Sequence, residues 1–184
     1  MMFDVLAQKL HPTPQAAIDI PQAAVLILIS RGESPSILYT KRAMHLRNHP
    51  GEVCFPGGMW EPGDRDLSVT ALRETCEEIG LPASETRLLG CLPQLHTRAG
   101  TPVTPFIASF DHSFALSPCE AELDSIFMVP LADFRRGIQV RMDRFERHGR
   151  VFEAPAYHYQ GYEIWGFTAA VTAQLLHLLA GLDS

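Results

Sequence analysis

The chain has 184 residues, of which 46% are hydrophobic and 20% are charged, and its formal net charge is -6. This length suits one domain, spanning residues 1–184, that can bury a sizeable core, and the composition excludes disordered and membrane-spanning chains. The net negative charge argues against a general nucleic-acid binder, because phosphate backbones are held by clustered Lys and Arg side chains.

The N-terminal part of the sequence predicts a helix and then a buried strand. The first twenty residues, which include Pro12 and Pro14, suggest a helix followed by an irregular segment. The apolar run from Ala23 to Ser30 has the length of a strand and lacks the flanks of a signal peptide. The four cysteines form no C-x-x-C pair, which predicts neither a disulfide framework nor a zinc site. We therefore expect a cytoplasmic protein with no membrane partner; the sequence does not decide its oligomeric state, and a homodimer is one alternative.

Several further strands and two helices follow from the hydrophobic pattern. Runs bounded by turn signals predict strands over 23–30, 37–41, 87–94, 103–110, 126–130, 150–153 and 157–159. Helices are predicted over 68–79 and 168–179, the second apolar on nearly all sides and therefore packed deeply. Strands, a helix, more strands and a last helix predict an α+β fold or an α/β sandwich with a mixed sheet.

The helix predicted over 68–79 has one acidic face and one apolar face. Glu74, Glu77 and Glu78 are spaced three and four residues apart, so they converge on one side. Arg73 precedes Glu77 by four residues and can orient its carboxylate. The residues expected to enter the core from the other side are Val69, Leu72, Cys76 and Ile79.

Three neighbouring carboxylates repel one another unless a positive charge lies among them. A divalent cation meets this need, and all-oxygen ligands favour Mg²⁺ or Mn²⁺ over zinc. The preceding glycine-rich loop can bend to bring the carbonyl of Gly58 to the same ion. On charge alone, a solvated helix face explains the cluster equally well.

The stretch from 58 to 81 resembles the signature of the Nudix hydrolases. The residues that match it are Gly58, Arg73, Glu74, Glu77, Glu78, Gly80 and Leu81. Asp64 stands where Glu is usual, one extra residue separates it from Arg73, and Thr75 replaces an aliphatic residue, which weakens any role for Asp64. The resemblance covers about residues 20–180. It implies a Nudix fold, with a mixed β-sheet sandwiched between α-helices and an acidic helix that binds Mg²⁺ or Mn²⁺ beside a nucleoside diphosphate.

A second resemblance lies upstream, over about residues 38–58, and is to the motif of coenzyme A pyrophosphatases within that family. The matching residues are Leu38, Thr40, Ala43, Arg47, Gly51, Phe55, Pro56, Gly57 and Gly58, and Tyr39 departs from the usual Leu. This resemblance implies a substrate-binding segment that includes Arg42, Arg47, Gly51, Phe55 and Gly57.

The charges of this segment agree with such a substrate. Lys41, Arg42 and Arg47, with His45 and His49, make the densest cationic stretch of an acidic chain. Coenzyme A carries a pyrophosphate and a 3′-phosphate, and Arg side chains suit phosphate oxygens. The alternative is that these cations only make a loop soluble.

The segment beginning at Pro118 resembles a region where family members often carry an acidic residue near the metals. Glu122 is the candidate for a metal ligand or general base, with Glu120 in reserve, although an acidic pair before a strand is also common in ordinary turns. The sequence around Trp165 and Phe167 also resembles the subgroup, and packing explains these two side chains more simply.

Together these patterns predict a metal-dependent pyrophosphohydrolase. Its expected reaction splits coenzyme A or an acyl derivative into 3′,5′-ADP and 4′-phosphopantetheine or its acyl form. Glu77, Glu78 and Glu122 are the expected catalytic residues, and Gly58, Glu74, Glu77 and Glu78 the expected metal ligands. One alternative is the same chemistry on ADP-ribose, a dinucleotide or an oxidised nucleoside triphosphate. Another is a non-catalytic domain that senses nucleotides.

Overall fold

The computed structural model describes residues 2–12, 20–147 and 150–182. Its helices are α1 (Met2–Lys9), α2 (Leu67–Ile79), α3 (Leu131–Arg136) and α4 (Gly166–Ala180), with a short 3₁₀ turn, η1 (Ala83–Glu85). The strands of the larger sheet are β1 (Ala23–Arg31), β2 (Ser36–Arg42), β3 (Val53–Cys54), β4 (Gly57–Met59), β5 (Thr86–Cys91), β6 (Leu95–His96), β7 (Pro102–Asp111) and β8 (Leu123–Pro130). A smaller sheet contains β9 (Gln139–Arg147), β10 (Arg150–Tyr159) and β11 (Tyr162–Ile164).

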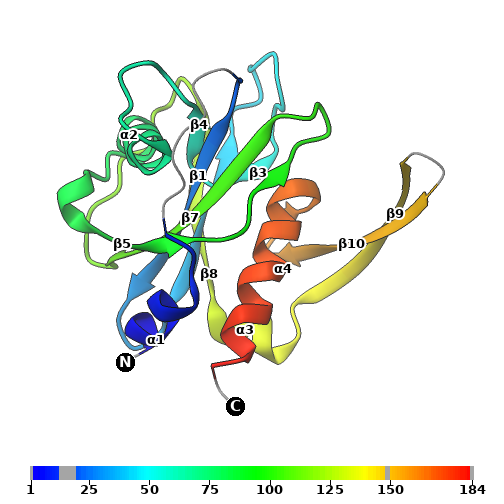
Figure 1. The fold of residues 1–184 in the computed structure, drawn as a ribbon. Coiled ribbons are helices and arrows are strands. Elements are labelled where there is room, and N and C mark those ends of the chain that lie inside the picture. The colour runs from blue at the N-terminus through cyan, green and yellow to red at the C-terminus, as the bar shows by residue number, and fades with distance from the viewer. Residues whose placement is uncertain (1, 13–19, 148–149, 183–184) are drawn as a thin grey trace.

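The larger sheet is mixed, as the sequence predicts. Strands β1 and β7 pair in parallel along their whole length at its centre, and the other pairs are antiparallel. Helix α2 covers one face of this sheet, and α1 and α4 lie on the other, as Figure 1 shows. This confirms the prediction of an α+β fold with a mixed sheet between helices.

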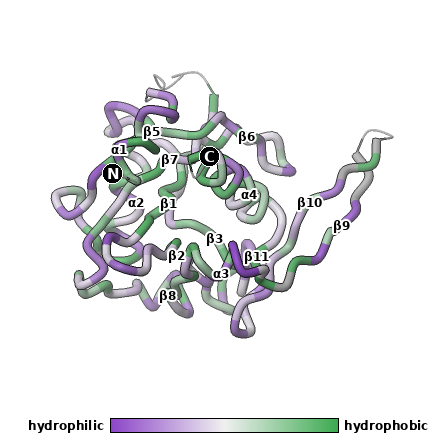
Figure 2. Tube along the Cα trace, turned by 90° about the horizontal axis from the view of Figure 1, so that it is seen from below, coloured by the Kyte–Doolittle hydropathy of each residue, from purple (hydrophilic) through white to green (hydrophobic). Residues whose placement is uncertain are grey.

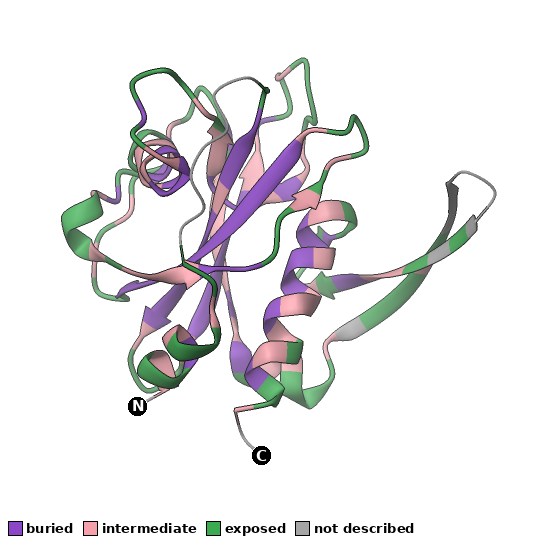
Figure 3. Cartoon of the chain, in the orientation of Figure 1, coloured by how far each residue is buried: buried purple, intermediate pink, exposed green. Residues whose placement is uncertain are grey.

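Alternation along β1 builds the two layers of core. Ala24, Leu26 and Leu28 face the layer that contains α2, whereas Ile27 and Ile29 face the layer of α4. Because both faces are covered, the strand reads as a continuous apolar run, and its residues are almost entirely buried, as Figure 3 shows for the whole centre of the sheet.

Several elements differ from the predicted ones. The predicted strand over 87–94 ends at Cys91, and the two short strands predicted over 150–153 and 157–159 form one strand, β10. Pro155 is tolerated inside β10 because it pairs only with Met142 of β9, at a point where β11 does not extend. Strands β3, β4, β6, β9 and β11 and helix α3 were not predicted. The helix expected near the N-terminus is α1, while Pro14 lies outside the described residues.

No helix among the described residues combines the length and the apolar character that crossing a bilayer requires. The described cysteines, Cys54, Cys76, Cys91 and Cys119, are all free thiols. This agrees with the absence of a disulfide framework in the sequence prediction.

Candidate active site

Helix α2 is held at both ends by its own sequence. The carboxylate of Asp66 caps its N-terminus by accepting hydrogen bonds from the backbone N–H groups of Ser68 and Val69, at 2.9 and 3.2 Å. Gly80 ends it in the left-handed conformation, with φ 70°, as the sequence predicts. The two caps therefore fix where α2 begins and ends.

The buried face of α2 is not the one that the hydrophobic pattern predicts. Val69 and Leu72 are only partly buried and Cys76 is exposed, so only Ile79 of the expected set is fully enclosed. The side chains turned inward are Leu67, Ser68, Thr70, Ala71, Thr75, Glu78 and Ile79. The Thr75 hydroxyl is satisfied by donating to the Ala71 carbonyl at 2.7 Å. Glu78, a carboxylate, therefore lies on the buried side of α2.

Strand β4 brings the backbone close to this helix. It pairs with the start of β1, where Gly58 lies opposite Ala24 and Gly57 opposite Val25. Gly57 has φ 154°, and a Cβ there would lie 2.3 Å from the Ala24 carbonyl oxygen, so no other residue fits. A Cβ on Gly58 would lie 2.5 Å from the Glu74 carboxylate. The absence of a side chain at Gly58 therefore lets Glu74 lie directly against the strand.

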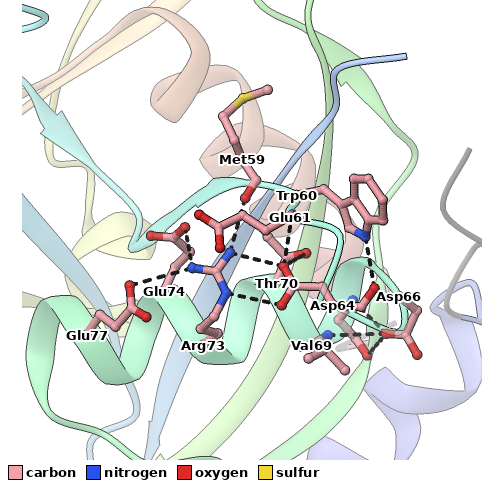
Figure 4. Close-up of polar contacts among 11 residues, drawn as sticks. Met59, Trp60, Glu61, Asp64, Asp66, Val69, Thr70, Arg73, Glu74 and Glu77 are labelled. Carbon is pink, nitrogen blue, oxygen red and sulfur yellow. Dashed lines mark hydrogen bonds and ion pairs between the residues drawn. The ribbon is translucent and has the colours of Figure 1, made fainter. Parts of the chain in front are cut away.

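Arg73 lies at the centre of a polar network that joins α2 to the loop before it (Figure 4). Its guanidinium donates to both carboxylate oxygens of Asp64 at 3.1 and 3.0 Å, to Glu74 at 2.8 Å and to the Met59 carbonyl at 3.1 Å. Glu77, the partner expected from the i, i+4 spacing, is farther away, at 3.5 Å on the exposed side. Arg73 therefore orients Glu74 more directly than Glu77.

Asp64 is the residue that sequence reasoning undervalued. Its side chain is only 4% exposed, and it also accepts from the Thr70 hydroxyl at 2.8 Å and the Glu61 backbone N–H. The hydrogen bonds from Arg73, with those from Thr70 and Glu61, hold the pKa of Asp64 below its usual range. The loop before α2 is one residue longer than the signature and Asp is one methylene shorter than Glu, so this carboxylate still reaches Arg73.

Glu78 is the most perturbed carboxyl among the described residues. It is 3% exposed, and burial together with the charges of Glu122 and Glu74 raises its pKa to about 8. Arg42 and the backbone N–H of Gly57 oppose that rise without cancelling it. Burial also raises the pKa of Glu74, to which the charges of Glu77 and Glu122 contribute. Helix α2, which carries Glu74 and Glu78, and the turn that carries Glu122 therefore meet in one region.

These residues suit a divalent cation in their chemistry. The Oε2 atom of Glu78 is buried and has no hydrogen-bond partner, which is costly unless a positive group binds there. Among the described residues, no three His, Cys, Asp or Glu side chains already stand close enough to enclose an ion. The reason is visible in the network, because Arg73 holds Glu74 at 2.8 Å and Glu77 lies on the exposed side of the helix.

The cationic segment reaches this region through β2 and the loop after it. Arg42 ends β2, its charge acts on Glu78, and its buried Nε atom has no hydrogen-bond partner. The next residue, Ala43, donates its N–H to the Glu122 carbonyl at 2.9 Å, and His45 Nε2 lies 3.1 Å from the Ala121 carbonyl. The loop that carries the predicted substrate-binding residues is therefore joined to the segment of Glu122.

The remaining candidates from the sequence have different surroundings. Arg47 and Glu120 are exposed, and neither side chain forms a hydrogen bond or an ion pair with another described residue. Gly51 has φ 71°, and a Cβ there would lie 2.6 Å from the sulfur of Met44. Phe55 is 3% exposed and stacks on Tyr39, with ring centroids 5.0 Å apart, so its ring supports the loop from the core.

Trp165 and Phe167, for which packing was the simpler interpretation, differ from each other. Phe167 packs against the core, whereas Trp165 is 45% exposed at the start of α4.

Comparison with known proteins settles the family. A family model described as the NUDIX domain matches residues 20–149. The chain belongs to the Nudix family. It is 36% identical over 154 residues to the uncharacterized Nudix hydrolase NudL of Enterobacter sp. (strain 638), covering 84% of this chain and 80% of that protein. It is also 36% identical over 168 residues to NudL of Photorhabdus laumondii, covering 91% and 90%.

Solved Nudix structures share the fold. The Nudix hydrolase RenU of M. smegmatis superposes with a TM-score of 0.58 and 16% identity, over 89% of this chain and 87% of that one. An Ap4A hydrolase of C. elegans in a binary complex gives 0.56 and 17%, over 88% and 96%. The Nudix domain of Shewanella oneidensis NrtR, complexed with ADP ribose, gives 0.52 and 16%, over 89% and 88%.

Membership makes this protein a Nudix hydrolase, an enzyme that acts on nucleoside diphosphate derivatives. Nudix hydrolases generally use divalent metal ions, which agrees with the buried, unpartnered oxygen of Glu78. The coarse prediction from the sequence, a hydrolase of the Nudix family, is confirmed.

Proposed function

We propose that this Nudix hydrolase cleaves the diphosphate of coenzyme A or its acyl derivatives, giving 3′,5′-ADP and 4′-phosphopantetheine or its acyl form. The observation that carries the proposal is the junction between the motif segment and the carboxylates. Arg42 acts electrostatically on Glu78, and the next residue, Ala43, is hydrogen-bonded to Glu122. A substrate bound by the cationic loop would therefore have its diphosphate beside the acidic region.

The carboxylates of Glu74, Glu77 and Glu78, with the carbonyl of Gly58, are the residues proposed to hold Mg²⁺ or Mn²⁺. The ions would neutralise charge on the diphosphate and lower the pKa of a bound water. Arg73 holds Glu74 in place, and Asp64 holds Arg73, so one guanidinium and one further carboxylate set the orientation of Glu74.

Glu122 is the proposed general base, with Glu120 as the reserve. Its charge raises the pKa of both Glu78 and Glu74, which places it within electrostatic reach of both. In this role its carboxylate would accept a proton from the attacking water as the new P–O bond forms and the P–O–P bridge breaks.

Arg42 and Arg47 are the proposed phosphate contacts of the substrate. The buried Nε of Arg42, at the end of β2, has no hydrogen-bond partner, and Arg47 is exposed in the loop that follows, so both side chains are candidates for binding an anion. Phe55 and Gly57 support this loop and β4 through packing, and Gly51 gives the loop its turn.

The proposal is tested by steady-state kinetics of the purified protein with Mg²⁺ or Mn²⁺ on coenzyme A and on ADP-ribose, for the wild type and for Arg47→Ala. Losing a charged hydrogen bond of 1.5 to 3 kcal/mol should lower kcat/KM for coenzyme A by roughly ten- to a hundredfold. Activity on ADP-ribose serves as the matched control. Equal losses on both substrates, or wild-type activity on coenzyme A, would count against Arg47 as a specificity residue.

A further inference from the structure

The segment of residues 119–122, which we call the Glu122 turn, leads from the end of helix α2 towards the start of β8. Its first residue, Cys119, donates its backbone N–H to the Glu78 carbonyl at 2.8 Å. The Cys119 carbonyl accepts hydrogen bonds from the N–H groups of Glu122 and Leu123, at 2.9 and 2.8 Å. One side of the Glu122 turn is therefore attached to the backbone of Glu78, a proposed metal ligand.

The start of β8, next to the Glu122 turn, contains a β-bulge. Strands β2 and β8 lie side by side, as Figure 2 shows. Their pairing shifts by one residue between Lys41 and Arg42, because β8 has an extra residue, Asp124, at this point. The Nζ atom of Lys41 lies 3.3 Å from the Asp124 carboxylate. An ion pair therefore spans the bulge beside the Glu122 turn.

Two hydrogen bonds join the Glu122 turn to the loop after β2. The backbone N–H of Ala43, a buried residue, donates to the Glu122 carbonyl at 2.9 Å. The Nε2 atom of His45 lies 3.1 Å from the Ala121 carbonyl oxygen. Because a carbonyl oxygen only accepts hydrogen bonds, Nε2 is the ring nitrogen that carries the hydrogen. The imidazole is therefore a donor to the backbone directly before Glu122.

The backbone that carries His45 is itself held by hydrogen bonds. The N–H of Arg42 donates to the Glu52 carbonyl at 2.9 Å, which closes the base of the loop. The Leu46 N–H donates to the Ala43 carbonyl at 3.3 Å, so residues 43–46 form a turn. The side chain of His45 is exposed, but it extends from a hydrogen-bonded turn near the base of the loop.

We propose that His45 is a positioning residue that holds the Glu122 turn between the substrate-binding loop and α2. This inference rests on the proposed function, in which Glu122 accepts a proton from the attacking water. A general base must lie within hydrogen-bond reach of that water, so a small displacement of the turn slows the chemical step. This role differs from the contribution of charge that the place of His45 in the cationic segment suggests.

Steady-state kinetics of the full-length protein with Mg²⁺, on coenzyme A and on ADP-ribose, compares two variants of His45. His45→Leu keeps a similar volume and removes the donor, whereas His45→Gln keeps an N–H donor at the end of the side chain. His45→Leu should lower kcat roughly three- to tenfold, the scale of one hydrogen bond, and change KM by less than about twofold. The loss should be equal on both substrates, because both need the base. His45→Gln should stay within about twofold of the wild type.

The matched control is His112→Leu, because His112 is an exposed histidine just after β7, at the opposite end of the sheet from the end of β2. It should have wild-type kinetics. A double-mutant cycle shows whether His45 acts through Glu122. In the Glu122→Gln background, His45→Leu should cause less than about twofold further loss of kcat.

Several results would overturn the proposal. They are wild-type kinetics for His45→Leu, a loss confined to KM, a loss that His45→Gln does not restore, and an equal loss in the Glu122→Gln background. Failure of the proposed function gives a different result. A wild type that cleaves ADP-ribose but not coenzyme A would refute the proposed substrate, while kcat on ADP-ribose would still test His45.

Hydrogen exchange tests the positioning role even if neither compound is cleaved. The amides of Glu122 and Leu123, which donate to the Cys119 carbonyl, report on the order of the Glu122 turn. They should exchange faster in His45→Leu than in the wild type and in His45→Gln. Equal exchange in the three proteins would show that His45 does not hold the turn.

Discussion

At the scale of single residues, the site depends on a carboxylate in an unfavourable place. Glu78 is buried, one of its oxygens has no hydrogen-bond partner, and neighbouring carboxylates raise its pKa to about 8. Such a group is costly in the metal-free protein and useful only if a cation binds beside it. Glu78 therefore lowers the stability of the metal-free protein, although the proposed activity requires it.

Replacing Glu78 with Gln should lower kcat by at least about two orders of magnitude, the scale of removing a key electrostatic stabiliser of the transition state. Initial rates at saturating metal check this. Glu85→Gln is the matched control, because Glu85 is exposed just beyond the end of α2. Wild-type turnover in the Glu78 variant would remove this residue from the mechanism.

The same residue predicts a pH dependence of stability without metal. Because the folded pKa of Glu78 lies above that of the unfolded chain, near 4.5, the folded state binds more protons between these values. The contribution of Glu78 to the free energy of unfolding is therefore fully present below pH 4.5 and is lost as the pH rises through about 8. Glu78 changes the free energy of unfolding by at most about 1.4 kcal/mol per pH unit in this range.

Urea unfolding in the presence of a chelator measures that slope. We expect Glu78→Gln to flatten the pH profile between these values and to be more stable than the wild type near pH 8, whereas Glu85→Gln should follow the wild type. Identical profiles for the wild type and Glu78→Gln would contradict the assigned burial effect.

Two adjacent glycines should respond very differently to the same change. Gly58→Ala pushes only against the side-chain carboxylate of Glu74, so the protein should fold and lose activity as that carboxylate shifts. Gly57→Ala places its methyl group 2.3 Å from a backbone oxygen of β1 and requires a strained φ, so it should impair folding itself. Circular dichroism and kinetics on both variants distinguish these outcomes. A fully active Gly58→Ala protein would exclude close control of Glu74 by β4.

At the scale of elements, α2 and its preceding loop act as one unit tied by Arg73. Asp64→Asn removes the charge from a nearly buried acceptor and should destabilise the fold by about 2 kcal/mol, the scale of a hydrogen bond to a charged group. Asp64→Glu restores the usual signature residue but adds a methylene in a site that is 6% exposed, and overpacking costs about 1 to 3 kcal/mol. Thermal unfolding should therefore rank both variants below the wild type. A stabilised Asp64→Glu protein would show that the longer loop does not compensate for the shorter side chain.

The same helix shows how far the sequence could predict the site. Its span, its end at Gly80 and its acidic residues are all readable, because capping and spacing are local properties. Its buried face is not, because Cys76 looks apolar yet is exposed, and Glu78 looks like a surface residue yet is buried. A hydrophobic pattern assigns carboxylates to the surface, so it cannot reveal one, such as Glu78, that is buried at a functional site.

The unpredicted strands have comparable reasons. Strand β4 consists of Gly57, Gly58 and Met59, which have little intrinsic preference for a strand and pair with β1 only through tertiary structure. Strand β9 is rich in charged residues, and its partner β10 contains Pro155, so neither has the alternation of a half-buried sheet over its full length. Strand β4 is stabilised by a strand distant in the sequence, whereas β9 is stabilised by its hairpin partner β10.

At the scale of the whole molecule, three separate segments meet at one end of the central sheet. Strand β2 and its loop bring cations, α2 brings carboxylates, and the turn before β8 brings Glu122. The parallel pair β1–β7 fixes the centre of the sheet, and the arm of β9 and β10 lies on the side of α4, away from α2 (Figure 1). The arm and the carboxylates of α2 therefore lie on different sides of the molecule.

The most direct test of the central claim is the identity of the products. The purified protein would be incubated with Mg²⁺ or Mn²⁺ and, separately, with coenzyme A, dephospho-coenzyme A, ADP-ribose, NADH and 8-oxo-dGTP, and the products would be separated by chromatography. We predict that 3′,5′-ADP and 4′-phosphopantetheine form from coenzyme A faster than any product forms from the other compounds. Preferential cleavage of ADP-ribose or the triphosphate, or no turnover of any compound, would contradict the proposed function.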